Sequence, residues 1–416
     1  MTKRVVVTGI GLITAAGTGT PALQAALEHG RSGVGPITRF DPTPFRSRIA
    51  AEVTGFDPLD HIEARQARRL DRFAQFAIAC GRLALRDAAL TRDRSDAAVY
   101  VGSALGGIAF AEAQHARFMT GGLRAVDPAL ALAVFGGAGA TAVAMDLDVR
   151  GPAVGNANSC ASGAIAIGEA FRLLRSGETD VALAGGAEAP LAPLTFGAFT
   201  AIRAMSTRND TPATACRPFD VGRDGFVMGE GAALLVLEDL GHALRRNARV
   251  YAEVLGYGAT NDAYHPTAPR PDGAEAARAM RRALADGGVA PDAVDYVNAH
   301  GSSTPLGDRA EAVALRCVFG PRTTTLPVSG TKPLYGHPLG ASGAIEAAIV
   351  CLALESGALP AAVNFFCSEP GAPESDLHLV GTNGHAPPGP PHVALSNSFG
   401  FGGINASLVF SQWTER

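Results

Sequence analysis

The chain has 416 residues, of which 47% are hydrophobic and 18% charged, and its formal net charge is −4. This composition suits a large core in two or three domains or one duplicated unit, without a general attraction for nucleic acid or an anionic membrane. No uninterrupted apolar run approaches the roughly 20 residues that span a bilayer, and no signal peptide is expected. The six cysteines show no Cys-x-x-Cys spacing, which predicts neither a metal site nor disulfides and favours a cytoplasmic location.

Short β-branched runs alternate along the chain with alanine-rich amphipathic stretches. This alternation predicts an α/β fold whose strands are largely buried. The predicted strands are 4–8, 98–102, 181–184, 233–237, 250–255, 294–298 and 393–396, and the predicted helices are 21–29, 61–89, 161–175, 273–286, 308–317 and 342–355.

Two of the predicted helices share a sequence pattern. Residues 161–177 read ASGAIAIGEAFRLLRSG and residues 341–357 read ASGAIEAAIVCLALESG, with eight of seventeen positions identical at an offset of 180 (341 − 161). A chance likeness between alanine-rich helices is one explanation, but we favour a duplicated unit whose two copies meet face to face. The halves would then be 1–250 and 251–416. Position 340 is Gly where the first copy has Cys160, so only one half carries this thiol.

Cys160 stands directly before the first repeat helix. A thiolate at a helix start faces unpaired backbone N–H groups and the positive end of the helix dipole, an effect of roughly 0.3–1 kcal/mol and at most about 2. Because one pKa unit is about 1.4 kcal/mol, the pKa of Cys160 is expected to fall from about 8.5 to about 7. The alternative is the usual fate of a free cysteine, that of a small buried apolar side chain.

Two histidines and a lysine lie in glycine-containing turns. His300 follows a predicted strand and His337 precedes the second repeat helix, positions from which side chains reach the rim of an α/β sheet. Neither has the spacing of a metal ligand, so a catalytic or an ordinary loop role is favoured. Among 35 basic residues only Lys3 and Lys332 are lysine, which codon bias explains, yet position 332 indicates a place where a compact ammonium is preferred.

A glycine-rich segment, SNSFGFGG at 396–403, ends the last predicted strand. Its glycines allow close backbone approach, which suits a backbone N–H donor, a flexible gate or an ordinary turn.

Together these segments resemble the condensing enzymes of fatty-acid and polyketide synthesis, the Cys-His-His branch of the β-ketoacyl-carrier-protein synthases in the thiolase superfamily. The motifs run nearly end to end: VVVTGIG (5–11), RPFD (217–220), RDGF (223–226), HGSSTPLGD (300–308), KPLYGH (332–337) and SNSFGFGG (396–403). The resemblance implies a thiolase fold, which is a five-layered α-β-α-β-α sandwich of two duplicated halves. It also implies an acyltransferase that condenses malonyl-ACP, with loss of CO₂, with a fatty-acyl, polyketide or polyene chain held as a thioester.

The resemblance assigns a role to each matching residue. Cys160 accepts the acyl group, and His300 and His337 hold the malonyl thioester and stabilise the enolate that forms when CO₂ leaves. The backbone N–H groups of Cys160 and Phe401 form an oxyanion hole. The other expected residues are Lys332, Glu346 and Asp308 as supporting charges, Phe226 as a wall of the malonyl pocket, and Gly400 with Phe401 as a gate over the acyl cavity. No metal or redox cofactor is implied, because loss of CO₂ drives the reaction.

The implied partner is an acidic acyl carrier protein. Its expected docking residues are Arg65, Arg68 and Arg69 on a predicted helix, with Arg203 and Arg208 elsewhere, although such a run is also typical of a solvated face. The implied assembly is a homodimer, or a heterodimer with a chain-length-factor-like subunit.

The chain departs from the usual motifs at Asn158-Ser159, Ser302, Pro333 and Ile404, none of which removes a catalytic group. The segment 129–134 (ALALAV) stands where the fatty-acid enzymes of the family tend to have bulkier aromatic residues near the partner subunit's acyl pocket. Its small side chains would admit a rigid, unsaturated or longer acyl chain, unless they reflect ordinary packing changes. They favour a specialised polyketide or polyene pathway over primary fatty-acid synthesis.

Three other assignments fit less well. A biosynthetic thiolase uses a second cysteine in a Cys-x-Gly turn, and Cys367 does not lie in one. The Cys-His-Asn branch requires Asn at the position of His337. A non-catalytic chain-length partner typically lacks the nucleophile that Cys160 would provide.

Overall fold

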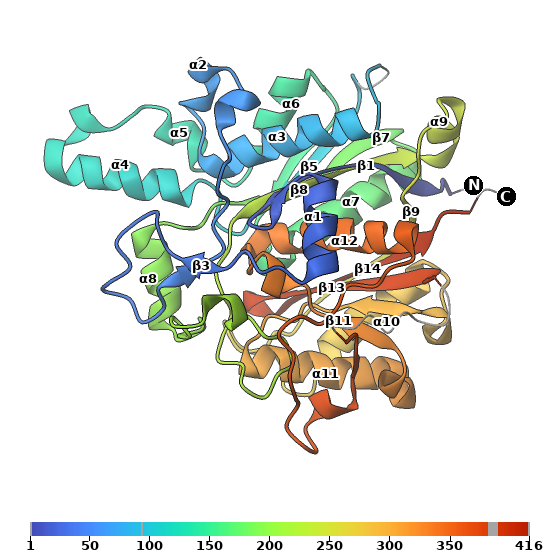
Figure 1. Cartoon of the computed structure of the whole chain (residues 1–416). Helices are drawn as coiled ribbons and strands as arrows, with labels where there is room; N and C mark the ends of the chain where they lie inside the picture. The colour runs from blue at the N-terminus through green and yellow to red at the C-terminus, as the bar shows by residue number, and fades with distance from the viewer. Residues whose placement is uncertain (1, 93–94, 382–389, 415–416) are drawn as a thin grey trace.

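The β-branched runs form one large mixed sheet, which is folded so that its two parts face each other (Figure 1). The computed structural model describes residues 2–92, 95–381 and 390–414, and within them the sheet has twelve strands. The first part contains β1 (Val5–Thr14), β2 (Gly17–Thr18), β5 (Ala98–Gly102), β6 (Ala153–Asn156), β7 (Val181–Glu188) and β8 (Gly231–Asp239). The second contains β9 (Ala252–Asn261), β10 (Tyr296–Asn298), β11 (Pro327–Ser329), β12 (His378–Leu379), β13 (Val393–Gly400) and β14 (Ile404–Gln412).

The two parts of the sheet have the same strand order. It runs β1-β8-β7-β5-β6 in the first and β9-β14-β13-β10-β11 in the second, and β1 pairs with β9 where the parts join. The directions also match, since the first three strands of each series are antiparallel neighbours and the last three are parallel. The duplicated halves that the repeat helices predicted are therefore present in the fold.

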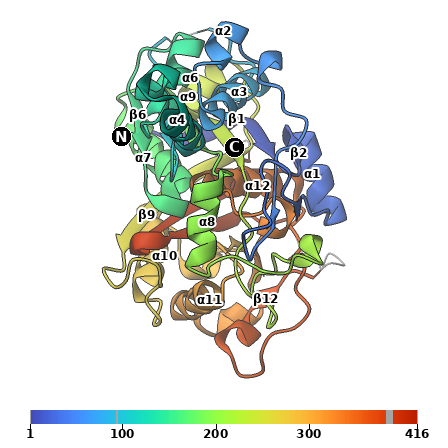
Figure 2. The ribbon, with the colours of Figure 1, turned by 90° about the vertical axis from the view of Figure 1, so that its left-hand side faces the viewer.

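Helices cover both parts of the sheet and fill the space between them (Figures 1 and 2). One outer layer consists of α3 (Arg72–Asp87) and α6 (Ala138–Leu147), and the other of α10 (Ala274–Asp286) and α11 (Pro305–Phe319). The middle layer consists of the two repeat helices, α7 (Ser162–Ser176) and α12 (Ser342–Ser356). Because α12 lies between the two parts of the sheet, it is buried on every side from Ser342 to Leu354. This is the predicted five-layered α-β-α-β-α sandwich.

The repeat helices approach each other closely at their first turns. A Cβ atom on Gly163 would lie 2.9 Å from the backbone nitrogen of Ala344, and one on Gly343 would lie 2.8 Å from that of Ala164. Only glycine fits at these two positions. The start of α7, which follows Cys160, is thereby placed against the start of α12, which follows His337.

The remaining elements flank the sandwich. They are α1 (Thr20–His29), α2 (Ala64–Ala67), α4 (Ile108–Gly121), α5 (Leu130–Ala133), α8 (Pro193–Ala201), α9 (Leu240–Arg245) and a small sheet of β3 (Gly35–Pro36) and β4 (Ile49–Ala50). Three of them, α4, α5 and α8, project from the left-hand side of Figure 1, the side that faces the viewer in Figure 2.

Every predicted strand coincides with an observed one, but one predicted helix needs correction. The single helix predicted at 61–89 is wrong, since Asp71 has an extended backbone and caps α3 by accepting the N–H of Phe73 at 2.9 Å. The stretch Leu339–Ser356 is long and apolar enough to cross a membrane by length and composition, with a mean hydropathy of 1.5. However, 89% of this stretch is buried inside the fold, as in the core helix of a soluble protein.

Candidate active site

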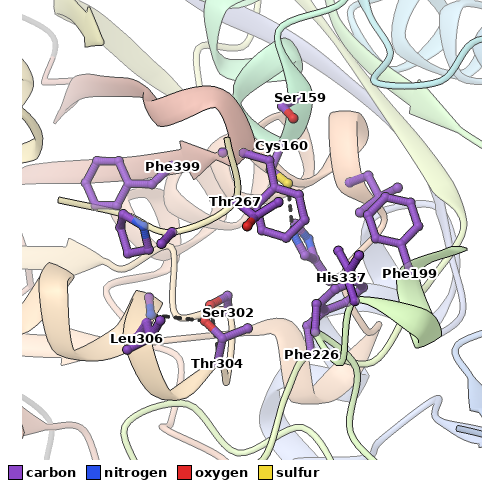
Figure 3. Close-up of a pocket in the computed structure, with 18 of the residues that line it drawn as sticks. Ser159, Cys160, Phe199, Phe226, Thr267, Ser302, Thr304, Leu306, His337 and Phe399 are labelled. Atoms are coloured by element: carbon purple, nitrogen blue, oxygen red, sulfur yellow. Dashed lines mark hydrogen bonds between the residues drawn. The ribbon is translucent and has the colours of Figure 1, made fainter. Parts of the chain in front are cut away.

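A cavity of about 460 Å³ lies between the two halves, beyond the carboxyl ends of the parallel strands β5 and β10. Figure 3 shows many of the residues that line it. This edge of an open α/β sheet is the usual place for a binding site. Seven of the predicted site residues line the cavity: Cys160, Arg203, Phe226, His300, His337, Gly400 and Phe401. Lys332, Glu346 and Asp308 lie behind its wall and are fully buried.

Cys160 lies at the base of the cavity, in a 3-10 turn (Ser159–Ala161) that leads into α7. Its side chain is 9% exposed, and its Sγ lies 3.2 Å from Nε2 of His337 (Figure 3). Burial raises the pKa of the thiol to about 12, although the Lys332 charge and the Phe401 N–H lower it. The predicted pKa of about 7 is therefore wrong, because that estimate counted the helix start and left out burial.

His337 is oriented from its far side. Its Nδ1 is 2.8 Å from the Ser342 hydroxyl at the first turn of α12, and its ring packs edge-on against Phe226 with centroids 5.4 Å apart. Burial and the nearby Lys332 charge lower its pKa well below 6.5. The imidazole is therefore neutral at pH 7, with Nε2 facing the sulfur.

His300 lies beside His337, with the two ring centroids 5.3 Å apart. Burial, the Lys332 charge and the neighbouring imidazole lower its pKa well below 6.5, so this ring is neutral too. Its turn is held by the Glu311 carboxylate, which accepts the N–H of His300 at 2.9 Å and that of Gly301 at 2.8 Å.

Lys332 and Glu346 form an ion pair in which both side chains are 0% exposed. The ammonium donates to the Glu346 carboxylate and to the His300 carbonyl oxygen, and it lies 3.4 Å from Nδ1 of His300. An ammonium can only donate, so Nδ1 accepts and the hydrogen of the neutral His300 ring is on Nε2. Lys332 thus selects the tautomer of His300 without reaching the cavity.

The turn between β13 and β14 lies against the other side of Cys160. A Cβ atom on Gly400 would lie 2.9 Å from the Cys160 backbone nitrogen. The backbone N–H of Phe401 faces the Cys160 thiol and lowers its pKa. The Phe401 ring stacks on Phe199, with centroids 6.3 Å apart and planes at 21°.

Asp308 supports two loops and touches neither histidine. Its carboxylate accepts the N–H groups of Phe219 at 2.8 Å and Ser303 at 3.0 Å, and it pairs with Arg223 at 3.7 Å.

The predicted docking arginines do not form one group in a single chain. Arg203 is exposed and lines the cavity, whereas Arg65, Arg68 and Arg69 are exposed on and just after α2 and do not line it. The guanidinium of Arg208 is half-buried; it donates to the Gly222 carbonyl at 2.5 Å and lies 3.9 Å from Asp224, so part of it is used within the chain.

The small-residue segment 129–134 was expected near the acyl pocket of a partner subunit, and it lies outside the cavity of its own chain. It forms α5 and its flanks, with Leu132 69% and Val134 41% exposed, and it does not line the cavity of its own chain. Within one chain it does not border the acyl site.

Comparison with known proteins agrees with this geometry. The family description "Beta-ketoacyl synthase, N-terminal domain" matches residues 2–243, and "Beta-ketoacyl synthase, C-terminal domain" matches residues 251–366. The chain belongs to the β-ketoacyl synthase family. It is 42% identical over 414 residues to 3-oxoacyl-[acyl-carrier-protein] synthase 2 of Staphylococcus aureus (strain COL), with 99% of both chains covered. The corresponding enzyme of Synechocystis is 41% identical over 419 residues, covering 99% of this chain and 98% of the relative.

Solved structures of β-ketoacyl synthases superimpose on the whole chain. A β-ketoacyl synthase from Burkholderia phymatum has a TM-score of 0.92 at 36% identity, covering 99% of this chain and 100% of that one. The ishigamide ketosynthase/chain length factor has a TM-score of 0.91 at 35% identity, with both chains fully covered. A type II polyketide ketosynthase in complex with its acyl-carrier protein has a TM-score of 0.91 at 31% identity, covering 99% and 100%. The protein is thus an acyltransferase that carries out the condensation of 3-oxoacyl synthases.

Sequence reasoning missed three polar residues at this synthase's site. Glu311, Ser342 and Glu188 are buried; Glu311 accepts the backbone N–H of His300, and the Ser342 hydroxyl is hydrogen bonded to the ring of His337. Glu311 lies one helical turn after Asp308, so the spacing of two acidic residues on one face of α11 was the available signal. Within residues 2–92, 95–381 and 390–414, no three His, Cys, Asp or Glu side chains are grouped so as to hold a metal ion.

Proposed function

We propose that this synthase joins an acyl group held on Cys160 to the two-carbon unit of malonyl-ACP, with loss of CO₂. The observation that carries this is the 3.2 Å contact between Cys160 Sγ and His337 Nε2, beside a second neutral histidine at the base of a cavity. A nucleophile in contact with a base that is itself oriented by a third group is the usual arrangement for covalent acyl catalysis.

The first step transfers the acyl group. Nε2 of His337 accepts the thiol proton as Sγ of Cys160 attacks the incoming thioester carbonyl, so a sulfur with a pKa of about 12 need not ionise beforehand. A C–S bond forms to Cys160 and the bond to the carrier thiol breaks. The proton on His337 then passes to the departing carrier sulfur, and the imidazole is neutral again.

The second step removes CO₂ from the malonyl thioester. The electrons of the broken C–C bond move onto the thioester oxygen, to which His300 donates a hydrogen bond from its Nε2–H. His337 donates a second one from Nε2 after its ring hydrogen has moved from Nδ1 to Nε2, a change that the Ser342 hydroxyl permits because it can accept from Nδ1 or donate to it. The negative charge develops only in the transition state, so these donors lower the barrier more than they tighten binding. The resulting enolate carbon attacks the acyl carbonyl, a C–C bond forms and Cys160 leaves as the thiolate, which takes up one proton.

Both tetrahedral intermediates carry an oxyanion next to Cys160. The backbone N–H groups of Cys160 and Phe401 are proposed to hold it, which is supported by the position of the Gly400–Phe401 turn against the nucleophile. Loss of one such donor typically costs about 2.7–4 kcal/mol.

The proposed partners are an acyl carrier protein and a second subunit. The relatives are named for their acyl-carrier-protein substrates, and one ketosynthase structure contains that carrier. Arg203 at the cavity and the exposed arginines near α2 are proposed to meet its acidic surface.

The second subunit is proposed from exposed apolar surface. The edge strand β6 is largely exposed, as are Phe118 and Met119 on α4 and Leu132 on α5. This exposure supports a homodimer or a heterodimer with a chain-length-factor-like subunit. A cytoplasmic location and a boundary of the halves at residue 250, between α9 and β9, complete the proposal.

The experiment that tests the reaction uses the full-length protein. Cys160→Ala should abolish acyl labelling and condensation, and Cys160→Gln should keep malonyl decarboxylation while condensation is lost. His300→Ala or His337→Ala should suppress the decarboxylation. Product formation by the Cys160→Ala variant would refute the proposal. Intact-protein mass spectrometry with a panel of acyl carriers would then show whether saturated, fatty-acid-like chains or longer polyene chains become attached.

A further inference from the structure

Because the fold is duplicated, the surroundings of Cys160 have a counterpart in the second copy of the repeat. This counterpart is filled by the carboxylate of Glu188. At an offset of 180 residues Gly340 corresponds to Cys160, and each stands in a 3-10 turn before its repeat helix. Strands β7 and β13 occupy the same place in the two strand orders and both have eight residues beginning Val-Ala-Leu. Their last residues are Glu188 and Gly400, so the first site pairs Cys160 with Gly400 and the second pairs Gly340 with Glu188.

The space around each pair explains why one site has a cysteine opposite a glycine and the other has a glycine opposite a glutamate. Gly400 lies against the Cys160 backbone nitrogen and leaves the space beside it free for a substrate oxygen. In the second site the Glu188 carboxylate fills that space, and its Oε2 accepts the N–H of Gly340 at 2.9 Å. A Cβ atom on Gly340 would lie 2.7 Å from this oxygen and 2.4 Å from the Ala104 nitrogen. A side chain at 340 and the carboxylate therefore exclude each other.

The same carboxylate also holds the wall of the active cavity. It accepts the N–H of Ala104 at 2.6 Å, the N–H of Leu105 at 3.2 Å and the Ser103 hydroxyl at 3.0 Å. Ala104 and Leu105 line the cavity at Cys160, as does Leu339, which precedes Gly340. Glu188 is 0% exposed and lines no part of the cavity itself. It thus joins two wall segments from opposite halves at a single point.

We propose that Glu188 is a positioning residue of the condensation site. Its carboxylate occupies the space beside the Gly340 N–H, which corresponds to the proposed oxyanion position beside the Cys160 N–H in the first half. From there it fixes the wall of the cavity against which the acyl chain lies. This rests on the proposed function, since it presupposes an acyl group on Cys160. The four hydrogen bonds that Glu188 accepts tie the 103–105 loop to the turn that follows His337.

The test compares Glu188→Gln and Glu188→Ala with a matched control, Glu238→Gln. Glu238 is also 0% exposed and lies at the other end of the same strand pair, where Val181 faces it, and it bonds to Thr8 and Arg246 away from the cavity. The readout is kcat/KM for acyl-carrier substrates with short and long chains, each measured after the thermal midpoint and the oligomeric state have been checked.

Glu188→Gln should lower kcat about tenfold or more and change the ratio of kcat/KM between short and long acyl chains at least threefold. Glu238→Gln should leave that ratio at its wild-type value even where it lowers the thermal midpoint. An unchanged ratio in a folded Glu188→Gln variant, or an equal change in Glu238→Gln, would overturn the proposal. If Glu188→Ala does not fold, the glutamine variant alone decides. Because wild-type protein must first form the acyl-Cys160 thioester in the same assay, a failure of the proposed reaction is recognised separately.

Discussion

Gly400→Ala offers a direct test of the oxyanion geometry. The φ of Gly400 is −135°, which any residue adopts, so alanine introduces no backbone strain there. Its new Cβ atom would instead meet the Cys160 nitrogen at 2.9 Å and the Ser159 Cβ at 3.0 Å. Because non-bonded heavy atoms rest about 3.5 Å apart, the Gly400–Phe401 turn and Cys160 must separate by about 0.5 Å.

That displacement moves the Phe401 N–H away from the proposed oxyanion position, while Cys160, His300 and His337 are all kept. Loss of one such donor costs about 2.7–4 kcal/mol, so kcat for condensation should fall roughly 10²–10³-fold. Steady-state kinetics with acyl- and malonyl-carrier substrates measures this, and the burst of acyl-enzyme should slow in parallel.

Gly35→Ala is the matched control, because no atom lies within 4 Å of the Cβ that this change adds. The Gly35→Ala variant should therefore show wild-type kinetics. A folded Gly400→Ala variant that keeps more than one third of the wild-type kcat would refute the assignment of the Phe401 N–H as an oxyanion donor.

Three further predictions follow from the buried charges and the surface arginines. The rate of Cys160 alkylation by iodoacetamide should rise about tenfold per pH unit from pH 6 to 9. Burial raises the thiol pKa to about 12, and a small alkylating reagent reacts with the free thiolate, without the proton transfer to His337 that accompanies attack on a bound thioester. Peptide mass spectrometry measures this rate, and a plateau near pH 7 would contradict the prediction. Lys332→Met leaves the Glu346 carboxylate unpaired in the core and should lower the free energy of unfolding by about 3–5 kcal/mol in urea titrations. Lys3→Met, which breaks a partly exposed pair with Asp180, should cost at most about 1 kcal/mol, and equal losses would show that burial is not the cause. Changing Arg65, Arg68 and Arg69 together to Glu should raise KM for a carrier-bound substrate and leave KM for the same acyl group on a small pantetheine thiol unchanged; an unaltered carrier KM would remove these arginines from the docking surface.

The sequence predicted what depends on local pattern. Strand positions, the repeat helices and the residues Cys160, His300 and His337 follow from periodicity and from motifs in a fixed order, and all three side chains meet in one cavity. The break at Asp71 was missed because an extended residue within an amphipathic stretch does not alter the periodicity.

Properties that depend on tertiary burial could not be predicted in this way. The raised pKa of Cys160 results from apolar surroundings supplied by several distant segments, and the internal role of Arg208 results from a carbonyl fourteen residues away. Glu188 lies beside Gly340 only because the two halves fold against each other, 152 residues apart in sequence.

The close packing of α7 on α12 also fixes the distance between the Cys160 sulfur and the His337 imidazole. The thiol belongs to one half of the molecule and both imidazoles belong to the other, so neither half alone contains a working set of reacting groups. The distance from sulfur to imidazole is set by two glycines, Gly163 and Gly343, that let the helices touch backbone to backbone. A duplicated protein with a complete set of reacting groups in each half would not need this close contact between α7 and α12. In this synthase the contact between the two copies forms the site, because Cys160 comes from one half and both histidines come from the other. Selection on activity therefore acts on every residue that keeps the two halves in register.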